Sequence, residues 1–217
     1  MLFDLHVHTD LSPCSRMTIR NILDRAKIRG LDGVCITDHD TMDIHYQLSE
    51  GVQENGICVL FGMEYTTAQG DFLLFGPFED LPKDLPTDVL LKTVRKSGGV
   101  AVAAHPFRRH RSTAEKVIRS GLCRAVESLN GRNSMTENAA VDKWLARYDL
   151  VRCGGSDAHT PNEVGTFATR FSNPVLSRTD LIRAIKSSMC SAVSFGDDDL
   201  IMSYPTSAAT GTTTFNK

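Results

Sequence analysis

The sequence has no long apolar run and little surplus charge of either sign. No apolar stretch approaches the roughly 20 residues of a membrane-spanning helix, and the N-terminus lacks the basic segment and apolar run of a secretion signal. A net charge of −2 disfavours a broad basic surface for long nucleic acid or an anionic membrane, but allows a local basic patch. We therefore expect a cytoplasmic protein that binds neither a membrane nor long nucleic acid.

Paired cysteines, internal repeats and low-complexity linkers are also missing. The six cysteines are scattered singly without a CxxC pair, so we expect reduced and mostly buried thiols. A chain of 217 residues can form one well-buried domain, which we place at residues 1–195. Residues 196–217 are rich in Ser, Thr, Gly and Ala and predict a mobile C-terminal tail.

Short apolar runs alternate with stretches of helical periodicity, which is typical of β–α units around a parallel sheet. Residues 17–30 predict an amphipathic helix closed by Gly30, and residues 88–99 and 139–148 repeat this pattern. The predicted strands cover residues 2–7, 33–37, 57–64, 71–76, 100–105, 124–129, 151–155 and, on a weaker pattern, 165–171.

Histidines and carboxylates gather at the C-terminal ends of the predicted strands, whereas Asp71 precedes one. In a barrel of parallel strands these ends converge on one mouth, so residues far apart in sequence would surround one site. The residues at strand ends are His6, His8, Asp38, His39, Glu64, His105, Glu127, Asp157 and His159.

His6 and His8 lie two residues apart on the first predicted strand, so both rings face the same side and can reach one ion. Alternating histidines alone are more often ordinary hydrogen-bonded polar residues, but four further strand ends also carry ligand-type side chains. Imidazole and carboxylate ligands suit Zn²⁺, Mn²⁺ or Fe²⁺. Because there are more candidates than one ion can use, we expect more than one ion.

Six stretches resemble the PHP (polymerase and histidinol phosphatase) family of metal-dependent phosphoesterases. In family order they read "DLHVHTDLSPCS", "GLDGVCITDHDT", "GMEYTTAQGDFLLFG", "GGVAVAAHPFR", "VESLNGR" and "GGSDAHT". The resemblance implies a single α/β domain, a distorted (β/α)7 TIM-like barrel, with two or three divalent ions at the C-terminal face of its strands.

The resemblance also implies which residues bind the first two ions. Glu64 would bridge the first ion to a second, which also takes His105. Asp71 stands where many relatives have a histidine that binds the second ion, and a carboxylate can replace it. The ligands of the first ion would be His6, His8, Glu64 and Asp157.

A third ion would take His39 and His159 by the same resemblance. Relatives complete this site with an aspartate or histidine in the loop after the first strand. Here Pro13 occupies the place of the usual aspartate, and Cys14 follows it. Cys14 is an alternative ligand as a thiolate, and without it the protein would hold two ions.

The expected chemistry is attack on phosphorus by a hydroxide held between two ions, with Arg108 stabilising the developing charge. The leaving group would take its proton from water on the third ion, His39 or His159. Arg108, Asn130 and Arg132 would bind substrate, with Arg108 favoured because it lies nearest His105, whereas a tight turn at Asn130 and Gly131 is the alternative for the other two. We expect a solvated loop for Arg109 and Arg111.

Two carboxylates have open roles. Asp4 would either orient a histidine ring or bond a backbone amide at the start of the strand. Asp38 would either support the ligand beside it or belong to a helix cap.

About fifty residues separate His105 from Asp157, which leaves no room for a lid subdomain and predicts an open cleft. The substrate would be a nucleotide, a short oligonucleotide or a small phosphomonoester. Two other functions fit part of the pattern. One is an amidohydrolase-like hydrolase of amides or lactones, whose barrel also begins with HxH, and the other is a non-catalytic metal-binding module.

Overall fold

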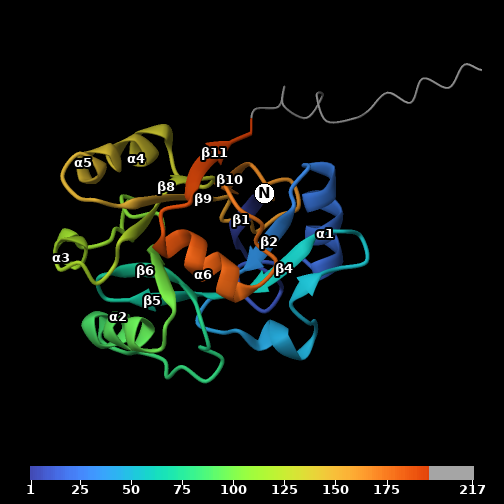
Figure 1. Cartoon of the computed structure of the whole chain (residues 1–217), viewed down its shortest axis with the longest axis horizontal. Helices are drawn as coiled ribbons and strands as arrows, with labels where there is room; N and C mark the ends of the chain where they lie inside the picture. Colours follow the sequence, from blue (N-terminus) through green and yellow to red (C-terminus); the bar gives the residue numbers. More distant parts are fainter. Residues whose placement is uncertain (196–217) are drawn as a thin grey trace, which may run out of the picture.

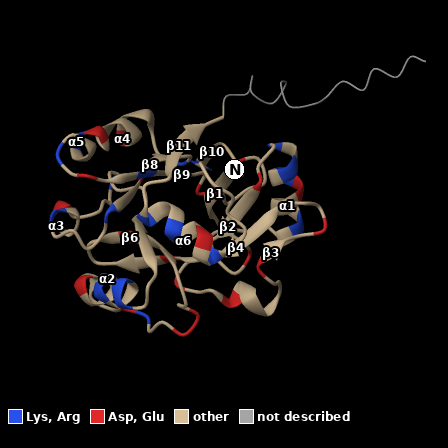
Figure 2. Ribbon diagram, viewed as in Figure 1, with Lys and Arg blue, Asp and Glu red and all other residues tan. Residues whose placement is uncertain are grey.

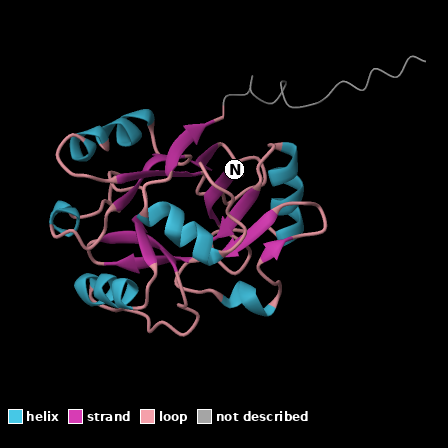
Figure 3. Ribbon diagram, viewed as in Figure 1, coloured by secondary structure: helices cyan, strands magenta, loops and turns pink. Residues whose placement is uncertain are grey.

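The strands of the protein form two mixed sheets in a computed structural model that describes residues 1–195 (Figures 1 and 3). One sheet has the order β11-β10-β1-β2-β4-β3 and the other the order β5-β6-β7-β8-β9. The predicted tail, 196–217, lies outside the described residues. The strands are β1 (Leu2–Val7), β2 (Gly33–Ile36), β3 (Gly51–Val52), β4 (Cys58–Phe61), β5 (Met63–Thr67), β6 (Gly70–Phe75), β7 (Val100–Ala103), β8 (Ala125–Asn130), β9 (Val151–Gly155), β10 (Phe167–Phe171) and β11 (Cys190–Ser194).

The helices are short and lie around the strands (Figure 3). None of the helices in the described part is long and apolar enough to cross a membrane. The helices are α1 (Ile19–Ile28), the 3₁₀ turn η1 (Asp43–Tyr46), α2 (Thr87–Lys96), α3 (Glu115–Arg119), α4 (Met135–Ala140), α5 (Asp142–Leu145) and α6 (Arg178–Lys186). Both Lys or Arg and Asp or Glu occur on α1, α2, α3, α5 and α6, whereas α4 carries only Glu137 (Figure 2).

The expected barrel of parallel β–α units needs correction. Strands β1, β2 and β4 are parallel, as are β7, β8 and β9. However, β6 is antiparallel to both of its neighbours, and β10 is antiparallel to β1 and β11. No closed barrel is detected among the described strands, and the single bridges Val7–Ala158 and His39–Glu64 link the two sheets.

The predicted strand 57–64 is in fact two strands in different sheets. β4 ends at Phe61 and β5 begins at Met63. A Cβ atom on the intervening Gly62 would lie 2.6 Å from the carbonyl oxygen of Leu74, so only glycine lets the chain pass this close to β6. This crossing brings Glu64 to the boundary between the sheets.

The helices follow local signals with some shifts. α1 begins after Thr18, whose side chain and that of Asn21 form a capping box. The predicted helix 139–148 is divided at Val141 into α4 and α5. The elements α6 and β11 were not predicted, although Ser177 caps α6 by accepting a hydrogen bond from the backbone of Asp180.

The first strand divides its side chains between the core and the site. Phe3 and Leu5 are fully buried and pack in an apolar cluster with Leu60 and Leu73. His6, on the opposite face of the strand, is also fully buried but faces other polar groups. The core therefore fixes the position of β1 and with it the histidine rings.

Candidate metal centre

Four buried side chains converge on one point at the ends of β1, β5 and β9. The Nε2 atom of His6 lies 3.3 Å from Oε2 of Glu64 and 3.5 Å from Oδ1 of Asp157. The Nε2 atom of His8 lies 3.4 and 3.3 Å from the same two oxygens. A tetrahedral site with bonds of about 2.0–2.1 Å has edges of about 3.3–3.4 Å, so these four atoms fit around one zinc-sized ion.

The ring nitrogens of His6 and His8 that face this point make no hydrogen bond within the described residues, although both are buried. A buried polar atom without a partner is costly unless something else binds it. A metal ion would satisfy both nitrogens.

The other nitrogen of each ring is held by a neighbouring side chain. The Nδ1 atom of His6 lies 2.9 Å from Oε1 of Glu127, and that of His8 lies 3.2 Å from Oγ of Ser12. The hydroxyl of Ser12 in turn donates to Asp38 at 2.5 Å. Both rings can therefore carry their proton on Nδ1 and present the Nε2 lone pair to an ion.

Glu64, Asp71 and His105 form a second group. The Nε2 atom of His105 lies 2.8 Å from Oε1 of Glu64 and 3.7 Å from Oδ2 of Asp71. The first group uses the other oxygen of Glu64, so this carboxylate lies between two groups that could each hold an ion. Asp71 reaches the site although it begins its strand, because β6 runs antiparallel to β7 and starts at the edge where β7 ends.

His8, His39 and His159 form a third group that could hold an ion. Nδ1 of His159 lies 2.8 Å from the backbone oxygen of Asp157, and Nε2 lies 3.0 Å from Sγ of Cys14. Cys14 is the most exposed of these residues and lines the entrance. The structure thus brings Cys14 to His159, one of the two residues that the sequence predicted for the third site, whereas the group itself does not include Cys14.

Three arginines surround a cleft of about 250 Å³ over these groups. Arg108 lies 2.7 Å from Oδ2 of Asp157, and Arg111 lies 2.8 Å from Oδ2 of Asp71. Arg111 is exposed in a loop, as expected, but its side chain also reaches the site. The guanidinium of Arg132 makes no hydrogen bond or ion pair within residues 1–195 and also lines the cleft.

Asn130 is fully buried rather than exposed in the cleft. Its side-chain oxygen accepts a hydrogen bond from Arg108 at 2.7 Å, and its nitrogen donates to Glu127 at 2.8 Å. A tight turn does follow it, but the side chain connects an arginine of the cleft to the carboxylate behind His6.

The electrostatics of the site favour bound cations. Burial raises the pKa of Glu64, but the charge of His6 and a hydrogen bond from His105 outweigh it and hold this pKa well below its usual value. Burial and the nearby charge of Glu64 raise the pKa of Asp71. Burial also lowers the pKa of His8 to about 4, which keeps the ring neutral and able to bind a metal.

Asp4 holds the backbone rather than a histidine ring. Its carboxylate accepts hydrogen bonds from the amides of Ser156 and Gly165, each at 2.8 Å. Of the two roles expected for Asp4, the structure shows the bond to backbone amides. It fixes the chain just before Asp157, which has a left-handed backbone with φ of 54°.

Close packing lets His6 meet its supporting carboxylate. A Cβ atom on Gly155 would lie 2.6 Å from Cβ of His6 and 2.9 Å from Oε1 of Glu127. A side chain at this position would displace one of them. The sequence marks Glu127 only as a polar residue at a strand end, because its contact with His6 joins two residues 121 positions apart.

A model of the PHP domain family matches residues 4–149, and a PHP-associated model matches residues 136–190. The first match covers more than half of the chain. The chain belongs to the PHP domain family. This confirms the resemblance carried by the sequence motifs. One relative of this PHP chain, the uncharacterized protein MJ1587 of Methanocaldococcus jannaschii, is 34% identical over 117 residues, which are 49% of this chain and 68% of the relative.

Solved structures share the PHP fold at low identity. PsfC from Pseudomonas syringae PB-5123 superposes with a TM-score of 0.72 and 23% identity, covering 92% of this chain and 94% of its own. A two-domain protein from Bacteroides vulgatus, named for a predicted PHP-like metal-dependent phosphoesterase, has a TM-score of 0.65 and 20% identity over 93% of this chain and 68% of its own. These similarities establish the fold alone.

Two further structural neighbours are named for different enzymatic activities. The lesion-specific endonuclease EndoQ of Pyrococcus furiosus has a TM-score of 0.65 and 18% identity, covering 88% of this chain and 58% of its own. An amidohydrolase from Chromobacterium violaceum has a TM-score of 0.60 and 16% identity, covering 91% and 99%. The fold is therefore compatible with more than one hydrolytic reaction.

Proposed function

We propose that this PHP protein is a metal-dependent phosphoesterase. The observation that carries the proposal is the convergence of two buried, unpartnered imidazole nitrogens and two carboxylate oxygens at the spacing of a tetrahedral metal site. The two sheets would be the halves of a distorted (β/α)7 barrel, with this site between them.

We assign two or three divalent ions, Zn²⁺, Mn²⁺ or Fe²⁺, to the three groups of side chains. The second group shares Glu64 with the first, as a bridging carboxylate would. The third group shares His8 with the first, so His39 and His159 would be the ligands of its own ion, and Cys14 would add a third ligand as a thiolate. The proposed ligands are His6, His8, Glu64 and Asp157 for the first ion, Glu64, Asp71 and His105 for the second, and His39, His159 and Cys14 for the third.

Divalent ions in these groups would lower the pKa of bound water and offset negative charge on phosphate oxygens. The chain itself supplies the positioning of the substrate. Arg108 is held by Asn130 at 2.7 Å and Asn133 at 3.0 Å, so its guanidinium has a fixed direction at the cleft. Arg132 has its charge free to pair with phosphate oxygens.

His159 is better suited to bind a metal than to donate a proton. Its Nδ1 can donate to the backbone oxygen of Asp157, which leaves the Nε2 lone pair facing Cys14. Burial lowers the pKa of His159, so the protonated form is scarce near neutral pH. We therefore expect solvent water to protonate the leaving group.

The size of the cleft limits the part of the substrate that enters it. About 250 Å³ holds a phosphate group and a few attached atoms, and three arginines line this space. The rest of the substrate would extend outside, as for a nucleotide, a short oligonucleotide or a small phosphomonoester. Acidic residues lie among the basic ones on most of the described helices, which disfavours long nucleic acid as the substrate (Figure 2).

The purified full chain tests this proposal in two measurements. Elemental analysis gives the number and identity of bound ions, and hydrolysis of 4-nitrophenyl phosphate, bis(4-nitrophenyl) phosphate and 4-nitroacetanilide is followed with Mn²⁺ and after chelation. We expect phosphoester hydrolysis that chelation abolishes. Amide hydrolysis alone would identify an amidohydrolase, and bound metal without any hydrolysis would favour a non-catalytic module.

Substitutions locate the activity. His6→Ala and Asp157→Ala should each lower the rate at least about 10³-fold, because each removes a ligand of the first ion. His110→Ala is the matched control, since His110 is exposed and does not line the cleft. Full activity in both ligand variants would rule out catalysis at this site.

A further inference from the structure

A second and larger cleft, of about 600 Å³, lies at the opposite ends of the strands that carry part of the metal centre. Its lining includes Val100, Ala125 and Val151, the first residues of β7, β8 and β9. The metal centre lies beyond the last residues of these strands, and the two clefts share no lining residue. A volume of this size falls within the roughly 300–1,000 Å³ typical of small-molecule sites.

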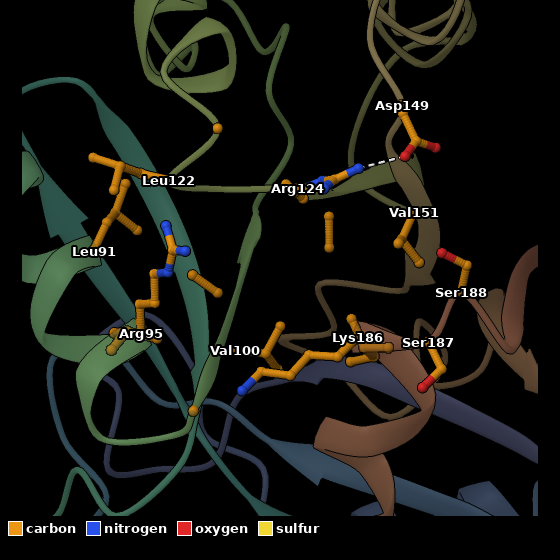
Figure 4. Close-up of a pocket in the computed structure, with 16 residues that line it drawn as sticks. Leu91, Arg95, Val100, Leu122, Arg124, Asp149, Val151, Lys186, Ser187 and Ser188 are labelled. Atoms are coloured by element: carbon orange, nitrogen blue, oxygen red, sulfur yellow. Dashed lines mark hydrogen bonds and ion pairs between the residues drawn. The ribbon is translucent and has the colours of Figure 1, made fainter.

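Apolar side chains form part of the walls of this second cleft. Leu91 of α2 and Leu122 lie on one side, Val100 lies below them, and Val151 lies on the far side (Figure 4). Ile185 of α6 completes the apolar lining. The cleft therefore offers a surface on which an apolar group of moderate size can be buried.

Charged side chains border the same cleft, and positive charges outnumber negative ones. Arg124 pairs with Asp149, the lone carboxylate among the described lining residues (Figure 4). Lys186 donates from Nζ to the backbone oxygen of Gly98 at 2.6 Å. This hydrogen bond to a neutral group leaves the positive charge of Lys186 without a negative partner. The guanidinium of Arg95 has no hydrogen-bond or ion-pair partner in the described part of the chain. The lining thus keeps a charge of +2.

Helix electrostatics explain part of this arrangement. Arg95 and Lys186 lie in the last turns of α2 and α6, where cations interact favourably with the carbonyl ends of helices. This effect favours a cation at each helix end. It does not explain why two helices end with unneutralised cations beside one apolar cleft.

We propose that the second cleft binds an organic anion. Its carboxylate or phosphate group would pair with Arg95 and Lys186, and its apolar part would lie against Leu122 and Val151. This site is separate from the metal centre and does not depend on the proposed hydrolysis.

Titration of the ¹⁵N-labelled full chain with four probes, followed by amide NMR, tests the site and the chemistry of its ligand. Hexanoate and hexylphosphonate carry both an anionic group and an apolar chain, and comparison of the two distinguishes a carboxylate from a phosphate ligand. Inorganic phosphate lacks the chain, and hexylammonium has the opposite charge. We expect saturable shifts at residues 95, 122 and 186 with at least one of the first two probes, and far weaker ones with the others.

Paired variants test the role of the charges. Arg95→Gln combined with Lys186→Gln should weaken binding of the better probe about ten-fold, since two partly solvated charge contacts are lost. Lys143→Gln removes an exposed charge on α5 outside the cleft and should change nothing. Both substituted side chains are exposed, and an unchanged spectrum of the free variant confirms its fold. Shifts confined to the metal centre, equal binding of hexylammonium, or an unchanged affinity in the double variant would each overturn the proposal.

Discussion

The Nδ1 atom of His6 lies 2.9 Å from the Oε1 atom of Glu127, although the two residues are 121 positions apart in the chain. The second oxygen of Glu127 accepts a hydrogen bond from the backbone amide of His105 at 2.7 Å. One buried carboxylate therefore orients a residue of the first group and fixes the backbone of a residue of the second.

Glu127→Gln should weaken metal binding by about 10- to 100-fold, because the neutral amide is a poorer acceptor for the ring proton of His6. Titration of the chelator-treated protein with Zn²⁺ measures this change. Glu54→Gln, at an exposed position away from the site, is the control and should bind as the wild type does. An affinity equal to that of the wild type would show that Glu127 only fills space.

Cys14→Ser should lower the number of tightly bound ions by one, because a hydroxyl does not readily form the anionic ligand that a thiolate provides. Elemental analysis counts the ions, and Co²⁺-loaded wild type should show a sulfur-to-cobalt charge-transfer absorption that the variant lacks. Cys190→Ser, at a half-buried cysteine that does not line the cleft, should keep both the number of bound ions and the charge-transfer absorption. Two ions in both the wild type and Cys14→Ser would mean that the third site is lost in this protein.

Arg132→Gln should raise KM for a phosphoester about ten-fold and leave the metal content unchanged, because the free guanidinium faces the cleft but contacts no carboxylate of the metal groups. Steady-state kinetics and elemental analysis of the same samples separate the two effects. Arg109→Gln is matched in charge and exposure but does not line the cleft. Equal KM changes in both variants would indicate a general effect of net charge.

Arg178→Gln should destabilise the protein by about 1–3 kcal/mol at pH 7. Arg178 lies 2.7 Å from Oε1 of Glu79 and 2.9 Å from Oε2 of Glu50, which ties the start of α6 to two distant loops. Burial raises the pKa of Glu79, but the hydrogen bond from Arg178 outweighs it and lowers this pKa below 4.5. The contribution of the pair is therefore present above pH 4.5 and lost as the pH falls through the lowered pKa.

Urea unfolding of wild type and Arg178→Gln at several pH values between 7 and 3 measures this dependence. The difference between the two proteins should shrink toward the acid end. Arg183→Gln breaks a pair in which the arginine side chain is 70% exposed, and should change stability little at any pH. A difference that stayed constant with pH would assign the effect of Arg178 to packing alone.

Local patterns and the family motifs predicted a set of side chains that the structure brings together, although their role as metal ligands stays a prediction. The two-residue period of a strand places His6 and His8 on one face, and the family motifs supply partners from distant strands. The structure brings these side chains within ion-binding distance of one another. Asp71 was the exception in position, since it begins a strand, and the antiparallel direction of β6 accounts for it.

The direction of strands and the path of loops could not be predicted in the same way. Apolar runs show that a strand exists but not which neighbour it joins, so the hairpin of β5 and β6 looked like another parallel unit. The contact of Arg111 with Asp71 depends on a loop that folds back, with the amide of Thr113 bonded to the oxygen of Pro106 at 2.9 Å. Such contacts follow from tertiary structure and have no spacing rule in the sequence.

The two sheets meet at the bridges Val7–Ala158 and His39–Glu64, and both bridges adjoin residues that we assign to ions. Ions bound there would add to the backbone hydrogen bonds that already link the sheets, such as those between His8 and Ala158 and between Asp40 and Glu64. Binding to the folded chain alone contributes RT ln(1 + [M]/Kd) to its stability, or about 2.7 kcal/mol when the free ion is at 100 times its Kd. The concentration of free metal ion would then determine the stability of the protein as well as its activity.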